Sequence, residues 1–347
     1  MEIFEKVLGV FNNKEIICYS MPNSKGVEVR VLNYGGIITD ILMPDRNNKR
    51  ENIVLKYKNW ESYIENPSYL GSLIGRTGGR IFNAEVDLGD KKLVLNKNYN
   101  PNQGHGGNEG FNKKFYEVKY EALENEAYIE LSRVSPDMEE NYPGNLKVKV
   151  KYILTEDNEL KIRYYAKSDK DTLVNMTNHS YFNLSGDGKE SILNHNLYIN
   201  SKSIVELNDV QAPTGLLMFI EGTEYDFTSS KKIGKDIDGN HPQLLQGKGY
   251  DIPWYIEGGE GPDLELYDEK SGRALEVYTD RKTIVVYTHN YPDDEILENG
   301  KSSQWRYGVA IEPQNPPIGV NSCFVEDSIL KQDEEYISQT IYKFEVR

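Results

Sequence analysis

The stretch LKVKVKYILTEDNELKIRYYAKS, residues 146–168, decides the fold class. Apolar or aromatic residues alternate with lysines over 146–152, and the alternation returns over 160–166 after the turn sequence TEDN. Because successive side chains of a β-strand point to opposite faces of a sheet, each half predicts a strand with one buried face. The two halves and the turn between them therefore predict a β-hairpin.

Similar signals recur along the chain. A second hairpin is predicted over 264–277, with its turn at 270–272, and the apolar run TIVVYT at 283–288 predicts a strand buried on both faces. Further strand candidates are residues 26–32, 82–88, 128–132 and 197–200. Helical periodicity is weak, and the short helix candidate is WESYIE at 60–65.

The predicted strands extend over the whole chain without an obvious linker. The 29 glycines and 14 prolines are spread throughout rather than gathered at one boundary, and no repeat of fixed period is present. All-β chains often exceed about 200 residues as one domain. We therefore predict an all-β fold, a single large antiparallel β-sandwich over residues 1–347 with few short helices. Two all-β domains are the alternative.

The chain is acidic, with 40 lysines and arginines against 55 aspartates and glutamates and a formal net charge of −15. A negative surface repels polyanions, so this balance disfavours nucleic acid and anionic membranes as partners and makes phosphorylated substrates less expected. The longest apolar runs, such as residues 216–220, are too short to cross a bilayer.

The two cysteines, Cys18 and Cys323, lie near opposite ends of the chain. Two cysteines without a CxxC spacing indicate neither a disulfide-rich scaffold nor a metal site of their own. The first residues, MEIFEKVLGVFNN, carry glutamates where a signal peptide is basic, and no apolar core follows. These features favour a cytoplasmic location.

Two segments resemble cofactor- or metal-binding motifs but lack residues at the required spacing. The glycine-rich run GSLIGRTGG at 71–79 matches neither the dinucleotide fingerprint nor the phosphate-binding P-loop. The segment DIDGN at 236–240 resembles the start of a calcium loop, but His241 stands where that loop needs glycine and Gly247 where it needs a glutamate. We therefore expect no cofactor and no metal.

Two of the five histidines stand in unusual surroundings. His105 lies in QGHGG at 103–107, where glycines let a ligand approach the backbone closely; a surface histidine in a glycine-rich turn is the alternative. His179 lies in TNHSYFNL at 177–184, a segment dense in hydrogen-bonding residues, where a structural histidine is the alternative. Structural or exposed positions are expected for His195, His241 and His289.

Three charged residues stand apart from the general acidity. Glu312 follows the run YGVAI at 307–311, where partial burial would raise its pKa toward that of a general base. Asp251 lies beside aromatic residues in GYDIPW, and Arg80 offers a forked pair of donors to neighbouring hydroxyls. Taken singly, each is also explained as a surface salt-bridge or turn residue.

Together these segments resemble the galactose mutarotase (aldose 1-epimerase) family, nearly from end to end. The resemblance rests on the order and spacing of YGGI at 34–37, LMPDR at 42–46, GRTGGRI at 75–81, GHGG at 104–107, TNHSYFNL at 177–184, APTG at 212–215, GTEYDF at 222–227, GYD at 249–251 and EPQ at 312–314. It implies the large β-sandwich of that family, a galactose mutarotase-like supersandwich, which agrees with the strand-rich pattern.

The resemblance also implies roles for individual residues. The family's catalytic acid and base are one histidine and one glutamate, which correspond to His179 and Glu312. His105 would lie near the ring oxygen of the sugar. Arg80 and Asp251 would hold hydroxyls distant from C1, and Tyr287 is a further expectation for a ring-facing aromatic. The implied reaction interconverts the α and β anomers of a free aldohexose, with galactose, the sugar in the family's name, as the expected substrate.

This reaction needs only proton movements. A base removes the proton of the C1 hydroxyl, an acid protonates the ring oxygen, and the ring opens; rotation about C1–C2 and closure with reversed roles give the other anomer. The substrate partner would be a small free sugar, and the reaction is consistent with the missing cofactor motifs. A positioned acid or base contributes about 10²–10⁴-fold to rate.

The chain departs from the family pattern at several positions that touch the expected pocket. Gly79 stands where the family often has an asparagine, Gly104 where it often has a leucine, and Pro313 where it often has a threonine. None of these changes removes a catalytic group, but together they leave the preferred sugar open. The resemblance implies no role for Gln314.

Three other functions are compatible with parts of the sequence. A non-catalytic sugar-binding or sensing module would use the same sandwich without needing an acid–base pair. A glycoside-cleaving enzyme would need two carboxylates, for which Asp251 and Glu312 are the available pair. A sugar-phosphate mutarotase would need a cationic cluster near the pocket, for which only Arg76 and Arg80 are at hand.

Overall fold

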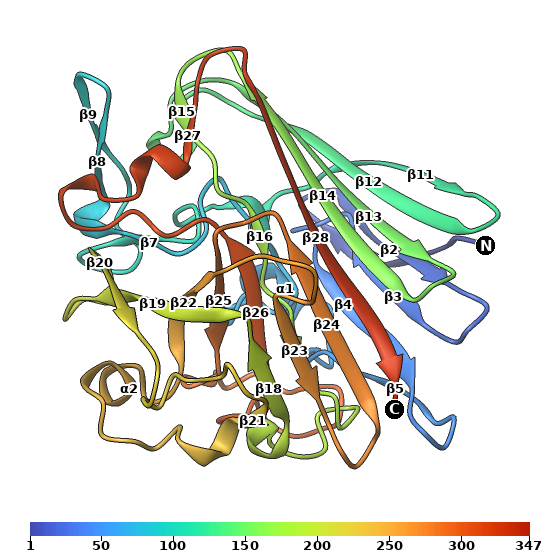
Figure 1. The fold of residues 1–347 in the computed structure, drawn as a ribbon. Helices are drawn as coiled ribbons and strands as arrows, with labels where there is room; N and C mark the ends of the chain where they lie inside the picture. Colours follow the sequence, from blue (N-terminus) through green and yellow to red (C-terminus); the bar gives the residue numbers. More distant parts are fainter.

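The computed structural model describes residues 1–347, and it is built almost entirely of antiparallel strands (Figure 1). The predicted hairpin is present, because β13 (Leu146–Thr155) pairs antiparallel with β14 (Glu159–Ser168) from Leu146 opposite Ser168 to Leu154 opposite Leu160. The apolar residues of β13 are buried and its first two lysines are exposed, as the alternation requires.

This hairpin belongs to a nine-stranded sheet. In spatial order its strands are β11 (Glu117–Ala122), β12 (Glu126–Ser135), β13, β14, β28 (Glu335–Val346), β24 (Arg273–Thr279), β23 (Leu264–Tyr267), β18 (Asn196–Ile199) and β21 (Lys231–Lys232). The second predicted hairpin is β23 with β24. The last strand of the chain, β28, lies between β14 and β24, so the C-terminal segment joins the two parts of this sheet (Figure 1).

Two further sheets complete the main architecture. The six-stranded sheet has the order β17 (Tyr181–Phe182), β26 (Val309–Gln314), β25 (Thr283–Tyr287), β22 (Asp251–Ile256), β19 (Ser201–Leu207) and β20 (Pro213–Phe219). The five-stranded sheet runs in chain order through β1 (Phe4–Phe11), β2 (Lys14–Pro22), β3 (Glu28–Leu32), β4 (Ile38–Pro44) and β5 (Arg50–Asn52).

Short paired strands and short helices connect these sheets. The pairs are β6 (Leu73–Ile74) with β16 (Thr177–Asn178), β7 (Arg80–Ile81) with β10 (Gln103–Gly104), β8 (Glu85–Leu88) with β9 (Lys91–Val94), and β15 (Thr172–Leu173) with β27 (Ile329–Leu330). The helices are α1 (Ser62–Glu65) and α2 (Pro242–Gly247), with single 3₁₀ turns at Phe82–Ala84, Phe111–Lys113, Glu139–Asn141, Ile192–Asn194, Ile233–Lys235, Val320–Ser322 and Val325–Asp327. Neither α-helix has the length or apolarity to traverse a bilayer.

The all-β prediction is confirmed, and one local prediction needs correction. The strand expected over 82–88 begins only at Glu85, because Asn83 and Ala84 have φ values of 53° and 56°, which a strand does not adopt. The segment that resembles a calcium loop instead leads into α2. His241 caps this helix by accepting a hydrogen bond from the backbone N–H of Gln243, and Pro242 occupies the first turn, where proline is favoured.

The main core draws on all three large sheets. It contains 54 buried residues that range along the chain from Tyr19 to Phe344. The inward faces of β13 and β14 contribute one alternate set of side chains, while β25 is buried on both faces as its apolar run predicts. Through residues such as Ile284 and Val286, this core covers one face of the six-stranded sheet.

Candidate active site

One face of β22, β25 and β26 forms the floor of the pocket. In these antiparallel strands Asp251 lies opposite Tyr287, and Val285 lies between Pro253 and Glu312. Residues opposite each other in an antiparallel pair point to the same face, and so do residues two apart along one strand. Asp251, Tyr287 and Glu312 therefore project from one surface, although 61 positions separate Asp251 from Glu312 (312 − 251).

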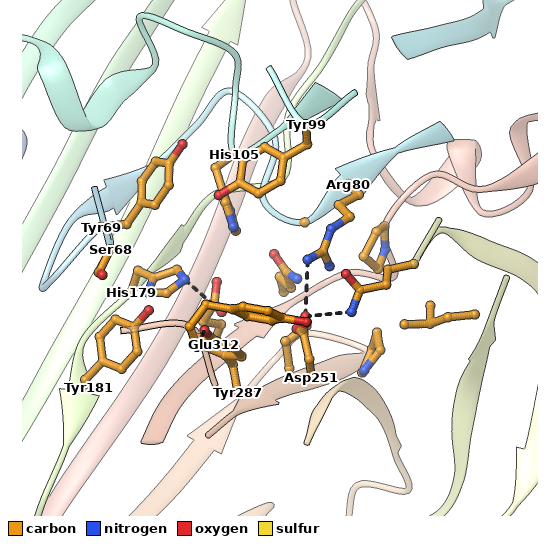
Figure 2. A pocket seen from close by; sticks show the side chains of 18 of the residues that line it. Ser68, Tyr69, Arg80, Tyr99, His105, His179, Tyr181, Asp251, Tyr287 and Glu312 are labelled. Atoms are coloured by element: carbon orange, nitrogen blue, oxygen red, sulfur yellow. Dashed lines mark hydrogen bonds and ion pairs between the residues drawn. The ribbon is translucent and has the colours of Figure 1, made fainter. Parts of the chain in front are cut away.

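The other walls come from loops over this floor. Nineteen residues line the pocket: Pro67, Ser68, Tyr69, Gly79, Arg80, Tyr99, His105, His179, Tyr181, Leu207, Gln211, Asp251, Pro253, Val285, Tyr287, Tyr291, Glu312, Gln314 and Pro317. All six residues expected from the sequence to act in the site are among them, and Figure 2 shows them facing one cavity.

His179 is positioned by the backbone at the end of β16. Its N–H donates to the carbonyl of Ser72 at 2.9 Å, and its carbonyl accepts from the N–H of Gly71 at 3.0 Å. Gly71 has φ +68°, and a Cβ there would lie 2.0 Å from the carbonyl oxygen of Ile38. Glycine is therefore required at position 71. Through its hydrogen bond to the His179 carbonyl, this turn helps to position the backbone that carries the imidazole.

His179 and Glu312 form a buried pair of titratable groups in the pocket. His179 Nε2 lies 3.3 Å from Glu312 Oε1, and the two residues are 4% and 2% exposed. Neither His179 Nδ1 nor Glu312 Oε2 has a hydrogen-bond partner in the protein. In each residue, therefore, one polar atom faces the other residue and a second polar atom has no partner in the protein (Figure 2).

Burial changes the pKa of both members of this pair. It raises the pKa of Glu312 well above its usual value, with a further rise from the charge of Asp251 and an opposing effect of Arg80. It lowers the pKa of His179 to about 3. Both shifts oppose an isolated charge, so the pair is best described as holding one shared proton. Such a pair has one proton to give and one site to receive, which is what acid–base chemistry requires.

His105 packs beside this pair. Its ring centroid lies 5.2 Å from that of His179 in an edge-to-face arrangement and 4.9 Å from that of Tyr69. Burial lowers the pKa of His105 well below its usual value, and His179 and Arg80 lower it further, so the ring is neutral. Gly106, next in the chain, has φ +86°, and a Cβ there would lie 1.9 Å from the carbonyl oxygen of Gly75. The glycines around His105 thus serve close backbone packing.

Arg80 and Asp251 form the polar group at the other side of the pocket. Arg80 Nη2 donates to Asp251 Oδ2 at 3.1 Å, and Gln211 Nε2 donates to the same oxygen at 3.2 Å. The guanidinium also lies 5.7 Å from the ring centroid of Tyr99. Because both donors use Oδ2, Oδ1 of Asp251 is left to accept from a ligand hydroxyl.

Aromatic rings form much of the remaining wall. Tyr181 lies 5.0 Å from His179 and 5.9 Å from Tyr287, measured between ring centroids. Tyr287 accepts a hydrogen bond from the backbone N–H of Tyr291 at 3.0 Å, which holds its ring at the pocket. Tyrosine combines an apolar ring face with a polar tip, a composition suited to a sugar.

Several of these residues were not expected from the sequence. Tyr181 is part of the TNHSYFNL segment, so its position near His179 was accessible from the sequence. Tyr69, Tyr99 and Gln211 carry no motif, and they reach the pocket because loops bring them there. Tyr69 and Gln211 adopt positive φ values of 55° and 57°. No pattern in the sequence predicts this backbone geometry.

Arg76 is a correction to the cationic cluster considered from the sequence. Its side chain is buried away from the pocket and donates six hydrogen bonds, to the carbonyls of Ser135, Pro136, Pro143 and Gly144 and to the hydroxyls of Ser135 and Thr172. Arg80 alone reaches the pocket, where it is paired with Asp251. The pocket therefore has no Arg76–Arg80 pair to receive a phosphate.

The other histidines also lie outside the pocket. His195 is buried and its Nε2 accepts from the backbone N–H of Leu184 at 2.9 Å. His289 is buried with its Nε2 3.2 Å from the hydroxyl of Ser303. Together with the cap role of His241, these contacts give all three a structural explanation.

The chain is similar to known proteins over nearly its whole length. Residues 18–343 match the family model of aldose 1-epimerase. Bovine galactose mutarotase is 34% identical over 93% of this chain and 92% of its own, and maltose epimerase of Levilactobacillus brevis is 29% identical over 99% of both. A crystal structure of galactose 1-epimerase from Lactobacillus acidophilus superposes with a TM-score of 0.90 at 27% identity, covering 99% of both chains. The chain therefore belongs to the aldose 1-epimerase family and is an enzyme that isomerises carbohydrates.

Proposed function

We propose that this enzyme interconverts the α and β anomers of free aldohexoses, with galactose as the main substrate. The observation that carries the proposal is the buried His179–Glu312 pair, with 3.3 Å between its nearest atoms, at the floor of a pocket walled by tyrosines. The names of the relatives, galactose mutarotase above all, support the choice of sugar.

In the proposed reaction Glu312 is the base and His179 the acid. Glu312 removes the proton of the C1 hydroxyl while His179 protonates the ring oxygen, and the bond between C1 and that oxygen breaks to leave an aldehyde. Rotation about C1–C2 exposes the other face of the aldehyde. Attack by the former ring hydroxyl then closes the ring, with His179 accepting a proton and Glu312 returning one.

The remaining residues hold the part of the sugar that does not turn. Asp251 and Arg80 would bind hydroxyls distant from C1, since their polar atoms lie on the far side of the pocket from His179 (Figure 2). His105, neutral and beside His179, would contact the ring oxygen, and Tyr287 would face the ring. Because Arg80 is already paired with a carboxylate, the site favours a neutral sugar over a sugar phosphate.

Polarimetry on freshly dissolved α-D-galactose tests the proposal. The enzyme should speed the change of optical rotation above the buffer rate, with a higher kcat/KM for galactose than for α-D-glucose or α-maltose. Maltose is included because the Levilactobacillus brevis relative is a maltose epimerase. Binding of galactose in a calorimeter without faster anomerisation would instead support the non-catalytic module.

A further inference from the structure

Gln314 is a buried amide in the pocket that the proposed mechanism does not use. It is the last residue of β26, its side chain is 0% exposed, and it lines the same pocket as Glu312. Neither its Oε1 nor its Nε2 has a hydrogen-bond partner in the protein. Because burying a polar group without a partner is costly, a side chain of this kind in a binding pocket points to a ligand as its partner.

Its position along the strand places it beside the acid–base pair. Glu312 and Gln314 are two residues apart on one strand, so their side chains share a face and start about 7 Å apart. Asp251 is aligned through Tyr287 with Ala310, two residues before Glu312 on β26. Gln314 and Asp251 therefore lie in opposite directions along the strands from Glu312.

The loop over Gln314 is shaped to make room for its amide. A Cβ on Gly78 would lie 2.1 Å from Gln314 Oε1, and a Cβ on Gly79 would lie 2.5 Å from Pro317 Cγ. Gly79 also has φ +70°, which side chains rarely adopt. A side chain at position 78 would therefore displace the amide, and one at position 79 would collide with Pro317.

We propose that the Gln314 carboxamide binds a hydroxyl on a ring carbon of the sugar and so helps determine which aldoses the enzyme accepts. It can donate from Nε2 or accept at Oε1, and the protein offers neither atom another partner. This inference rests on the proposed function, because it assumes that a free sugar occupies the pocket. It adds a specificity residue to the acid–base pair and the Arg80–Asp251 anchor.

The test compares wild type with Gln314→Met, which keeps the length of the side chain and removes its hydrogen-bonding atoms. Steady-state constants are measured with galactose and with its 2-, 3-, 4- and 6-deoxy derivatives. With galactose, KM should rise about tenfold while kcat stays within about twofold. For one deoxy sugar, wild type should show the same tenfold loss and Gln314→Met should add nothing, because the partner hydroxyl is already missing.

A second site variant and a surface control ensure that the test does not depend on Gln314→Met alone. Gly78→Ala should displace the amide without removing it and should reproduce the same deoxy-sugar pattern. Gln332→Met, on the exposed surface, is the matched control and should leave every constant unchanged. If Gln314→Met does not fold, Gly78→Ala carries the test.

The possible results separate this inference from the proposed function. An active wild type whose KM is unchanged in both site variants overturns the role of Gln314 alone. An equal loss on galactose and all four deoxy sugars also overturns it, since that result indicates a purely structural amide. A wild type that neither anomerises nor binds these sugars overturns the proposed function and this inference with it.

Discussion

Burial controls the protonation of the two groups at the pocket floor. His179 and Glu312 are nearly inaccessible, and the pKa shifts of both oppose an isolated charge. A shared proton lets the pair act as acid and base without either group being charged alone in a region of low dielectric. The anchor on the other side is arranged differently, because Arg80 Nη2 donates to Asp251 Oδ2 at 3.1 Å.

Glu312→Gln should abolish most of the activity and leave the fold intact. The amide has nearly the same shape as the carboxyl but cannot take a proton, so we expect kcat to fall by about 10²–10⁴-fold. Polarimetry measures the rate, and circular dichroism checks the fold. His179→Asn serves as the companion variant, and near-normal turnover in either protein would contradict the assignment of these two residues.

Gln211→Leu should weaken substrate binding with little effect on turnover. Gln211 is one of two donors to Asp251 Oδ2, and a hydrogen bond to a charged group is worth about 1.5–3 kcal/mol. Because Gln211 is only partly buried, we expect the lower end, a rise in KM of about tenfold for galactose. Arg80→Leu, which removes the other donor, is the comparison. A fall in kcat with unchanged KM would show that Gln211 acts elsewhere.

The secondary-structure elements determine which side chains can meet. β22, β25 and β26 supply the floor through their register, while the turn before β6 and the end of β16 fix His179 through backbone hydrogen bonds. The β7–β10 pair brings Arg80 opposite Gly104, next to His105. A substitution at Gly104 should therefore alter the positions of pocket residues on both sides of it.

Gly104→Ala should disturb the site through Tyr99. A Cβ at position 104 would lie 2.5 Å from Cδ2 of Tyr99, whose ring packs near both Arg80 and His105. We expect a loss of about 1–3 kcal/mol in the free energy of unfolding, as for other overpacked sites, and a several-fold rise in KM. Denaturant unfolding and polarimetry measure the two effects. Gly261→Ala, where an added Cβ meets nothing within 4 Å and the φ is not positive, is the matched control.

Across the whole molecule, buried histidines make stability depend on pH. Burial lowers the pKa of His179 to about 3 and of His195 and His289 to about 4, and that of His105 well below its usual value. The unfolded chain binds protons near pH 6.5 and the folded protein does not, so this stabilisation is present above pH 6.5 and lost as the pH falls. Glu312 acts in the opposite sense, because its raised pKa favours the folded state below about pH 4.5.

The free energy of unfolding should therefore decrease between pH 6.5 and 4. A single histidine such as His195 contributes about 3 kcal/mol to this decrease, and its protonation also removes the acceptor for the Leu184 N–H. Urea unfolding across this pH range measures the effect. His195→Gln should make the curve less steep, and a curve that is flat from pH 6.5 to 4 would contradict the neutral buried state of these rings.

We propose that residues 1–347 form one domain, as the sequence predicts. The core takes residues from Tyr19 to Phe344, and β28 at the end of the chain lies within the nine-stranded sheet. We expect one cooperative unfolding transition, with the same midpoint by far-UV circular dichroism and by the fluorescence of its tryptophans, of which Trp254 is buried. Two resolved transitions would indicate separate folding units.

The sequence by itself determined the strand-rich class and the 146–168 hairpin, and it predicted six residues that line one pocket. Alternation of apolar and polar residues is a local property, and the motifs that carry His179 and Glu312 are short and contiguous. Tertiary structure alone decided that Arg76 turns away from the pocket, that Gln211 supports Asp251 and that Gln314 lies unpartnered beside Glu312. Those facts depend on strand register and loop φ values, which are set by packing between residues far apart in the chain.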